Sequence, residues 1–153
     1  MHVILNAYLE RLEALHSDIW RAIAGLPPEA LDWLPGPGMN SLSVLVVHLA
    51  GAERYWIGDM AGEDSSGRVR EAEFQVKGLK VEMLATLLTD TLIHSRKVLE
   101  NLTVDDLGSG RSSARDGETY TVAWCLVHAL EHTGLHLGQI QITREIWERE
   151  HGG

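Results

Sequence analysis

Three histidines, His128, His132 and His136, recur at intervals of four in a stretch that otherwise reads as helix. At about 100° per residue, a step of four returns nearly to the same face, so the three rings form one slowly drifting stripe. Repeated imidazoles on one apolar stripe are costly to place unless something binds them. A divalent metal ion is the simplest partner, because neutral imidazole nitrogen is a good ligand for zinc, nickel, copper and iron.

The spacing limits how many of these histidines one ion can use. His128 and His136 are about 12 Å apart along a helix that rises about 1.5 Å per residue, whereas metal–nitrogen bonds measure only about 2.0–2.1 Å. One helix therefore offers one adjacent pair, either His128 with His132 or His132 with His136. A complete site needs at least one further ligand from elsewhere in the fold.

Hydrophobic periodicity predicts an all-α chain. Apolar residues recur at the spacing of amphipathic helices, and prolines, glycines and polar runs separate the helical stretches. The predicted long helices cover residues 2–26, 40–60, 80–101 and 119–150, with a short turn of helix at 28–31. Four such helices predict a four-helix bundle, and the length suits a single domain over residues 1–153.

Two polar segments, residues 61–78 and 108–117, interrupt the helical pattern. The connections that contain them are longer than tight antiparallel helix pairs require. A bundle with such connections allows a pair of parallel neighbours joined by a crossover.

The second predicted helix is apolar nearly all round, so we expect it to be the most buried element. His48 stands in its middle. A lone histidine there is more often a hydrogen-bonded core residue, but His48 becomes a candidate third donor once a histidine pair elsewhere requires one. Glu53 lies about 140° round the helix from His48, which directs it toward a neighbouring helix.

Charge and cysteine content exclude several classes of protein. The formal net charge of −9 argues against a nucleic-acid-binding or anionic-membrane surface, because both require clustered Lys and Arg. Cys125 is the only cysteine, so no internal disulfide can form, and a small core residue is its ordinary role. No apolar run is long enough to span a bilayer and the N-terminus does not resemble a secretion signal, so we expect a cytoplasmic protein.

Two motifs, one on each of two predicted helices, resemble those of the DinB-like family of metalloenzymes. The order, separation and helical context of the motifs agree, and the resemblance covers nearly the whole chain. The residues that carry it are Asn40-Ser41-Leu42, His48, Glu53 and Trp56 on the second helix, and His132-x3-His136-x-Gly138-Gln139-Ile140 with Arg144 on the last.

The resemblance implies a four-helix bundle, usually a homodimer, whose metal is held by His48, His132 and His136. It thereby favours the pair of His132 with His136 and leaves His128 as a wall residue beside the site. Zinc or nickel is the first expectation for the ion, and iron and manganese also suit histidine donors. Characterised relatives are transferases that use thiols such as bacillithiol or mycothiol, and thiol-dependent isomerases of small unsaturated acids.

Three neutral imidazoles leave at least one coordination position open, as in catalytic zinc sites. Such a position can activate a bound water or a bound thiol, and the family resemblance implies the thiol, in an enzyme that transfers a low-molecular-weight thiol to a small-molecule electrophile. His128, Tyr55 and Gln139 are candidate pocket residues, although Tyr55 and Gln139 at such spacings are more often ordinary packing or hydrogen-bonding residues. The alternative is a non-catalytic metal-binding stress-response bundle that acts by binding a partner or ligand.

A competing motif overlaps the histidine stripe. His128-Ala129-Leu130-Glu131-His132 satisfies the H-x-x-E-H pattern of inverted zinc peptidases, with Glu131 as the base. Five residues match often by chance, and the remaining sequence does not resemble those enzymes. We therefore rank this interpretation below the three-histidine site.

Overall fold

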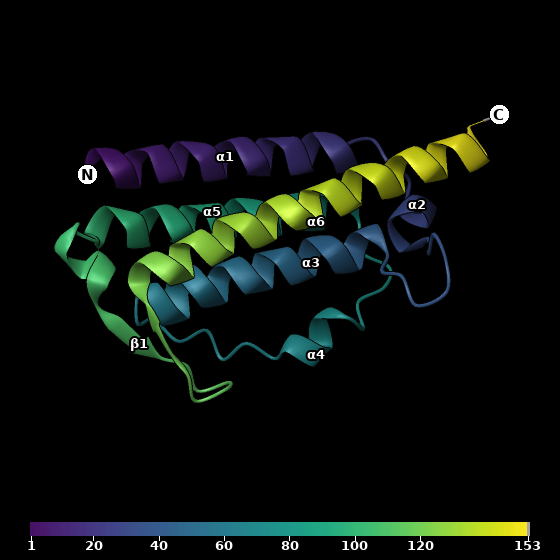
Figure 1. Cartoon of the computed structure of the whole chain (residues 1–153). Helices are drawn as coiled ribbons and strands as arrows, with labels where there is room; N and C mark the ends of the chain where they lie inside the picture. The colour runs from purple at the N-terminus through teal and green to yellow at the C-terminus, as the bar shows by residue number, and fades with distance from the viewer. Residues whose placement is uncertain (153) are drawn as a thin grey trace.

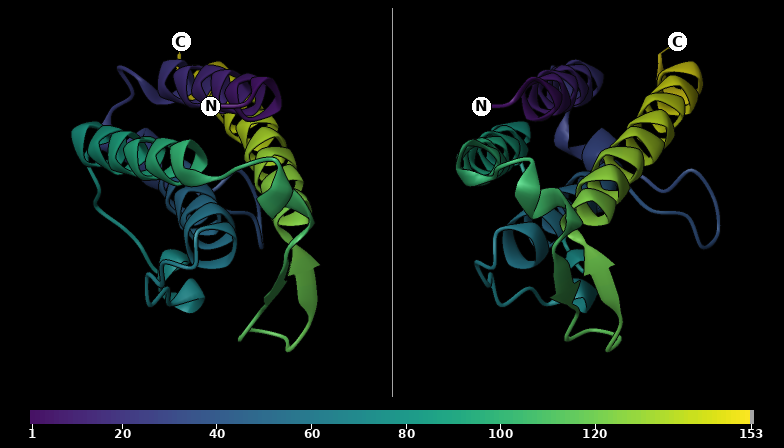
Figure 2. Two further views of the ribbon diagram at one scale, coloured as in Figure 1. Left: turned by 90° about the vertical axis from the view of Figure 1, so that its left-hand side faces the viewer. Right: turned by 60° about the vertical axis from the view of Figure 1, so that its left-hand side comes forward.

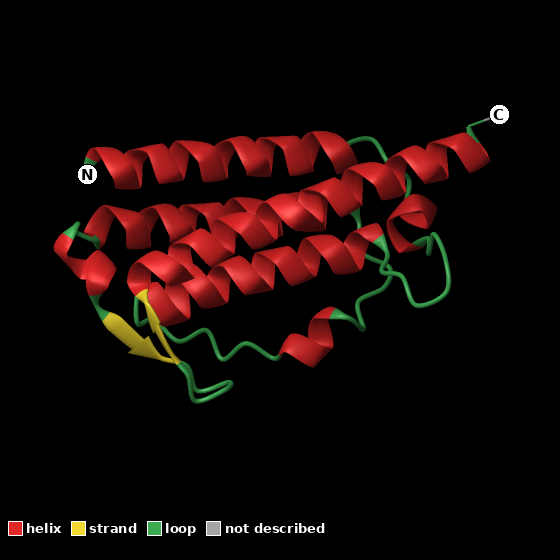
Figure 3. Cartoon of the chain, viewed as in Figure 1, coloured by secondary structure: helices red, strands yellow, loops and turns green. Residues whose placement is uncertain are grey.

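Four long helices lie side by side in the computed structural model, which describes residues 1–152 (Figure 1). They are α1 (Val3–Ile23), α3 (Leu42–Glu53), α5 (Val81–Asn101) and α6 (Val122–His151). The expected all-α four-helix bundle is confirmed. Within residues 1–152 the strands are limited to β1 (Gly110–Ser112) and β2 (Thr119–Thr121), which pair antiparallel as a small hairpin (Figure 3).

Each long helix packs against two others, in the order α1, α6, α3, α5 around the bundle (Figure 2). Helices α1 and α6 are parallel neighbours, because Tyr8 bonds to the Leu126 carbonyl near one end and Arg144 to the Ala24 carbonyl near the other. Arg144 thus joins α6 to the end of α1 rather than lying in solvent.

The crossover that the long connections allowed is present between α3 and α5, which run in the same direction (Figure 1). The connecting segment leaves the bundle after residue 61, contains the short helix α4 (Arg70–Glu73) and returns to the start of α5. Two shorter elements, α2 (Pro28–Asp32) and the 3-10 turn η2 (Asp105–Gly108), lie in the other connections.

Helix α3 forms the centre of the packing. Ser41 caps its N-terminus by accepting a hydrogen bond from the Val44 amide at 3.2 Å. All its residues except Val47 and Gly51 are buried, in agreement with its nearly continuous apolar sequence. Among the described residues, no helix combines the length and the apolar character that crossing a membrane requires.

Beyond Glu53 the helix continues as a π-helical stretch, η1 (Arg54–Ala61), where periodicity predicted uninterrupted α-helix. A π-helix bonds residues five apart, and the Arg54–Asp59 salt bridge of 2.9 Å has this spacing. The guanidinium of Arg54 occupies the space that a Cβ on Gly58 would require. Apolar periodicity carries no information on such a side-chain contact, so the wider turn was not predicted.

Glu53 contacts the neighbouring helix α5, as its position on the helix indicated, and also reaches α1 on the opposite side of the core. Its carboxylate lies 2.6 Å from His16 Nε2 on α1 and accepts a 2.6 Å hydrogen bond from the Ser95 hydroxyl on α5. Glu53 is 1% exposed and His16 is 5% exposed. This buried polar network joins three of the four helices.

Candidate metal centre

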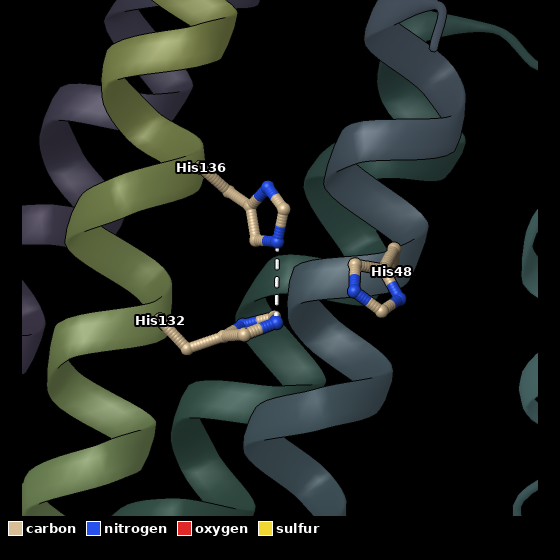
Figure 4. A group of neighbouring side chains, drawn as sticks. All are labelled: His48, His132 and His136. Atoms are coloured by element: carbon tan, nitrogen blue, oxygen red, sulfur yellow. Dashed lines mark hydrogen bonds between the residues drawn. The ribbon is translucent and has the colours of Figure 1, made fainter. Parts of the chain in front are cut away.

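Helices α3 and α6 bring His48, His132 and His136 together between them (Figure 4). One potential ligand atom from each residue lies within 4.8 Å of the other two. The ring centroid of His48 is 5.0 Å from that of His132 and also 5.0 Å from that of His136. These are the three residues that the family resemblance pointed to.

His132 and His136 direct the same ring nitrogen at one point. Their Nε2 atoms are 3.1 Å apart. Two donors on a tetrahedral ion with bonds of about 2.0–2.1 Å are separated by about 3.3 Å, so the pair suits a shared cation. His128 lies further off, with its ring centroid 5.9 Å from that of His132.

In two of the rings, Nδ1, the nitrogen that does not face the other histidines, is hydrogen-bonded to a side-chain oxygen. Gln139 Oε1 lies 2.7 Å from His136 Nδ1, and Glu73 Oε2 lies 2.7 Å from His48 Nδ1. An acceptor at Nδ1 keeps the ring proton there and leaves the Nε2 lone pair free for a metal. Figure 4 shows His48 presenting a ring nitrogen toward the other two histidines. His132 Nδ1 is buried without a hydrogen-bond partner in the described part of the chain.

Sequence reasoning missed Glu73. This residue belongs to a segment that was interpreted as a polar connection, yet its side chain is buried against His48. It also pairs with Arg68, whose Nη2 lies 2.9 Å from Glu73 Oε2. Nothing in the local sequence sets this glutamate apart from Glu71, which is exposed.

The surroundings keep the α6 histidines uncharged at neutral pH. Burial, followed by the repulsion of a second positive charge on His136 or His48, lowers the pKa of His132 from 6.5 to about 3. Burial also lowers the pKa of His136, against an opposing effect of its hydrogen bond to Gln139. Neutral imidazole is the form that binds metal, so these rings are prepared to act as ligands.

The pKa of the Glu73 carboxyl is held below its ordinary value. Burial alone would raise this pKa, but the hydrogen bonds from Arg68 and His48 outweigh it. The acceptor on the outer nitrogen of His48 is therefore a carboxylate at neutral pH.

Aromatic rings continue the histidine stripe along α6. His128 stacks on Trp124 with ring centroids 4.9 Å apart, and Trp124 stacks in turn on Tyr120 at 4.3 Å. The Trp56 ring, from η1, lies 4.8 Å from His128. Burial lowers the pKa of His128 as well. These rings, which we call the aromatic wall (Trp56, Tyr120, Trp124 and His128), adjoin His132.

Tyr55 lies near Arg68, the partner of Glu73, and its hydroxyl is 2.9 Å from the Ser113 hydroxyl. With Arg68, Arg70 and Arg115 it lines a hollow of about 370 Å³. The guanidinium of Arg115, in the loop between β1 and β2, lies 5.8 Å from the centre of the Tyr55 ring. Among the candidate pocket residues, Gln139 contacts a member of the group directly, whereas Tyr55 lines a hollow whose walls contain none of the three histidines.

The peptidase-like interpretation of the α6 sequence receives no geometric support. The Glu131 side chain of the peptidase-like pattern is 75% exposed, and its nearest approach to His128 Nδ1 is 3.9 Å. Cys125 is buried in the core, where desolvation raises the pKa of its thiol to about 11. A thiol of that pKa is neither a good nucleophile nor a ready metal ligand at neutral pH.

Comparison with known families and structures agrees with this geometry. A family model described as MST, mycothiol-S-transferase, matches residues 5–148. No curated protein matches the chain significantly.

Similar solved structures include two bacterial DinB-like proteins and a conserved protein. The DinB-like protein of Bacillus cereus is 17% identical with a TM-score of 0.76, covering 96% of this chain and 92% of its own. The DinB-like protein of Bacillus subtilis is 19% identical with a TM-score of 0.67, covering 98% and 93%. The conserved protein of Enterococcus faecalis is 18% identical with a TM-score of 0.73, covering 95% and 97%. These likenesses establish the DinB-like fold.

Proposed function

This chain belongs to the mycothiol-S-transferase family, and on that premise we propose that it is a metal-dependent enzyme that transfers a low-molecular-weight thiol to a small electrophile. The observation that carries the proposal is the convergence of His48, His132 and His136 from two helices, with ring nitrogens directed at one point. Such a donor set holds a divalent cation and leaves room for a further ligand.

A divalent cation at this position would supply an open coordination site where a thiol loses its proton at neutral pH. Zinc is the first choice, because three neutral imidazoles are common in its catalytic sites, and nickel is the second. Iron and manganese remain candidates on the donor set alone.

The protein's own residues prepare the site in two ways. Burial keeps His132 and His136 unprotonated, so no proton has to leave either ring before the cation binds. The accessible part of the aromatic wall, Trp124 at 42% exposed and His128 beside His132, provides an apolar surface where a small electrophile can pack. Holding the thiol at the cation and the electrophile on this wall would bring the two reactants into one site, which is how such a pair is favoured over reaction in solution.

The family name favours mycothiol as the thiol, and bacillithiol is the next candidate. Both are small polar thiols, so the proposal distinguishes them only by assay. The electrophile is expected to be small and partly apolar, because the aromatic wall offers rings for its recognition, with the Arg115 guanidinium 5.2 Å from the centre of the Trp56 ring as the nearby positive charge.

The proposal is tested with protein purified without chelator or nickel resin, then freed of metal and reloaded with zinc, nickel, iron or manganese. Each form is incubated with mycothiol, bacillithiol, glutathione or cysteine and a chromogenic electrophile. We expect turnover that depends on both metal and thiol, and that is lost in His132→Ala. Metal binding without turnover across the whole panel would support the non-catalytic alternative, a metal-binding bundle that acts through a partner.

A further inference from the structure

We infer that Glu73 is a positioning residue that fixes the orientation and tautomer of His48, so that this ring presents Nε2 to the cation. The inference rests on the proposed metal-binding function of the three histidines. It assigns a role to the connecting segment between α3 and α5, which crosses outside the bundle and brings Glu73 back to the site.

The contact itself is short and shielded from solvent. Glu73 Oε2 lies 2.7 Å from His48 Nδ1, and the two side chains are 8% and 9% exposed respectively. A carboxylate in this position accepts a hydrogen bond from Nδ1–H, and a neutral imidazole carries only one ring proton, which therefore stays on Nδ1. His48 is then held with Nε2 unprotonated and aimed away from Glu73, toward His132 and His136.

A glycine on helix α3 leaves space for this carboxylate. Gly51 lies one turn after His48, and a Cβ there would stand 2.2 Å from Glu73 Oε1. Real Cβ atoms do not approach an oxygen this closely, so any larger residue at position 51 would displace the carboxylate. The missing side chain of Gly51 therefore leaves the space in which Glu73 reaches His48.

Arg68 holds the other side of the carboxylate. Its Nε and Nη2 atoms donate to Glu73 Oε1 and Oε2 in a two-pronged ion pair. This pair opposes rotation of the carboxylate away from His48, and it also neutralises the negative charge. The contribution of Glu73 to metal binding is therefore expected to come mainly from orientation of the ring rather than from attraction of the cation.

The tautomer of His48 is measured first, in metal-free protein, by nitrogen-15 NMR of the imidazole rings. We expect the wild type to carry the His48 proton on Nδ1 alone. Glu73→Gln should keep this tautomer, because an amide oxygen also accepts from Nδ1, whereas Glu73→Ala should lose it. A mixture of tautomers in the wild type, or an unchanged Nδ1–H form in Glu73→Ala, would overturn the inference.

Zinc affinity is measured second, by competition with a chromogenic chelator. Loss of an outer hydrogen-bond partner typically weakens metal binding by about 10- to 100-fold, and we expect this for Glu73→Ala. The double variant Glu73→Ala/Arg68→Ala removes one charge of each sign, so a similar loss there identifies orientation as the cause. Equal affinity in the wild type and both variants would contradict the proposed role.

Two matched controls separate positioning from general damage. Glu71→Gln alters an exposed carboxylate on the same short helix and should leave affinity and tautomer unchanged. Gly51→Ala should weaken zinc binding by displacing Glu73, whereas Gly134→Ala, in α6 where an added Cβ meets nothing within 4 Å, should not. Circular dichroism confirms that each variant is folded.

The tautomer and metal-binding measurements can fail independently, so they distinguish the role of Glu73 from the proposed function. If wild-type protein bound none of zinc, nickel, iron and manganese, the proposed function would fail, while the tautomer measurement would still test the role of Glu73. If the wild type bound zinc and Glu73→Ala bound it equally well with the same tautomer, only the role of Glu73 would fail.

Discussion

His132 Nε2 and His136 Nε2 lie 3.1 Å apart on adjacent turns of α6, and neither ring carries a positive charge at neutral pH. Two neutral rings in this arrangement either share one proton or share one cation. The Nδ1 atom of His136 already has Gln139 as its acceptor, so its ring proton is accounted for. This pair and the nearby ring of His48 supply the nitrogen ligands of the proposed metal site.

The metal-free protein should lose stability as the pH falls from 7.5 to 5. The pKa of His132 is about 3 in the folded chain, against 6.5 for an ordinary histidine, so between these values the unfolded chain binds a proton that the folded chain does not. Above pH 6.5 both states are neutral and this effect is absent. Urea unfolding at pH 7.5, 6 and 5 measures it, and His132→Gln should show a weaker pH dependence than the wild type. Identical pH dependence in the two proteins would contradict the assignment.

His128 should be dispensable for metal binding. Its ring stacks on Trp124 and its centroid is 5.9 Å from that of His132, which fits a wall residue better than a ligand. We expect His128→Phe to retain the bound metal of the wild type and to change KM for the electrophile more than metal content. If His128→Phe lost its metal while His136→Ala kept it, the pair of His128 with His132 would be the true one.

Glu53→Ala should be strongly destabilising. It would remove the carboxylate that His16 and Ser95 contact in the core, and breaking a buried pair from one side costs about 3–5 kcal/mol. Urea unfolding at pH 7 measures the loss in the free energy of unfolding. Glu100→Ala, at an exposed position of α5, is the control and should change stability by no more than about 0.5 kcal/mol. A loss as small as that of the control would show that the network is not important for stability.

The homodimer expected from the family resemblance stays a prediction, and α6 offers a surface for it. Val127, Leu135 and Ile142 are 66%, 60% and 50% exposed, at intervals of eight and seven that keep them near one face of the helix. Light scattering coupled to size-exclusion chromatography should report a dimer for the wild type and a monomer for Leu135→Glu. A monomeric wild type would show that this surface does not pair two copies.

The sequence predicted the bundle well because its helices carry strong apolar periodicity and clear caps, such as Ser41 before α3 and Thr121 before α6. It did not predict the π-helical stretch η1, which accompanies a side-chain pair between Arg54 and Asp59. It also placed β1 in a polar loop and β2 in the first residues of the last helix, because three-residue strands are too short to show alternation.

For the candidate site, spacing alone left two histidine pairs open, and the resemblance, not the periodicity, selected His132 with His136. The tertiary structure shows why the choice matters, since only that pair brings its Nε2 atoms to one point with His48 alongside. Glu73 could not be found from sequence, because its contact with His48 spans 25 residues and depends on the path of the crossover.

The proposed function requires that one divalent cation is bound jointly by His48, His132 and His136. Elemental analysis after equilibrium dialysis of metal-free protein against zinc, and in parallel against nickel, iron and manganese, measures this for the wild type and for alanine variants at each position. We predict one zinc ion per chain in the wild type and a loss of tightly bound zinc in each folded variant. A wild type that retains no zinc, nickel, iron or manganese, or three variants that each retain a full equivalent, would contradict the claim.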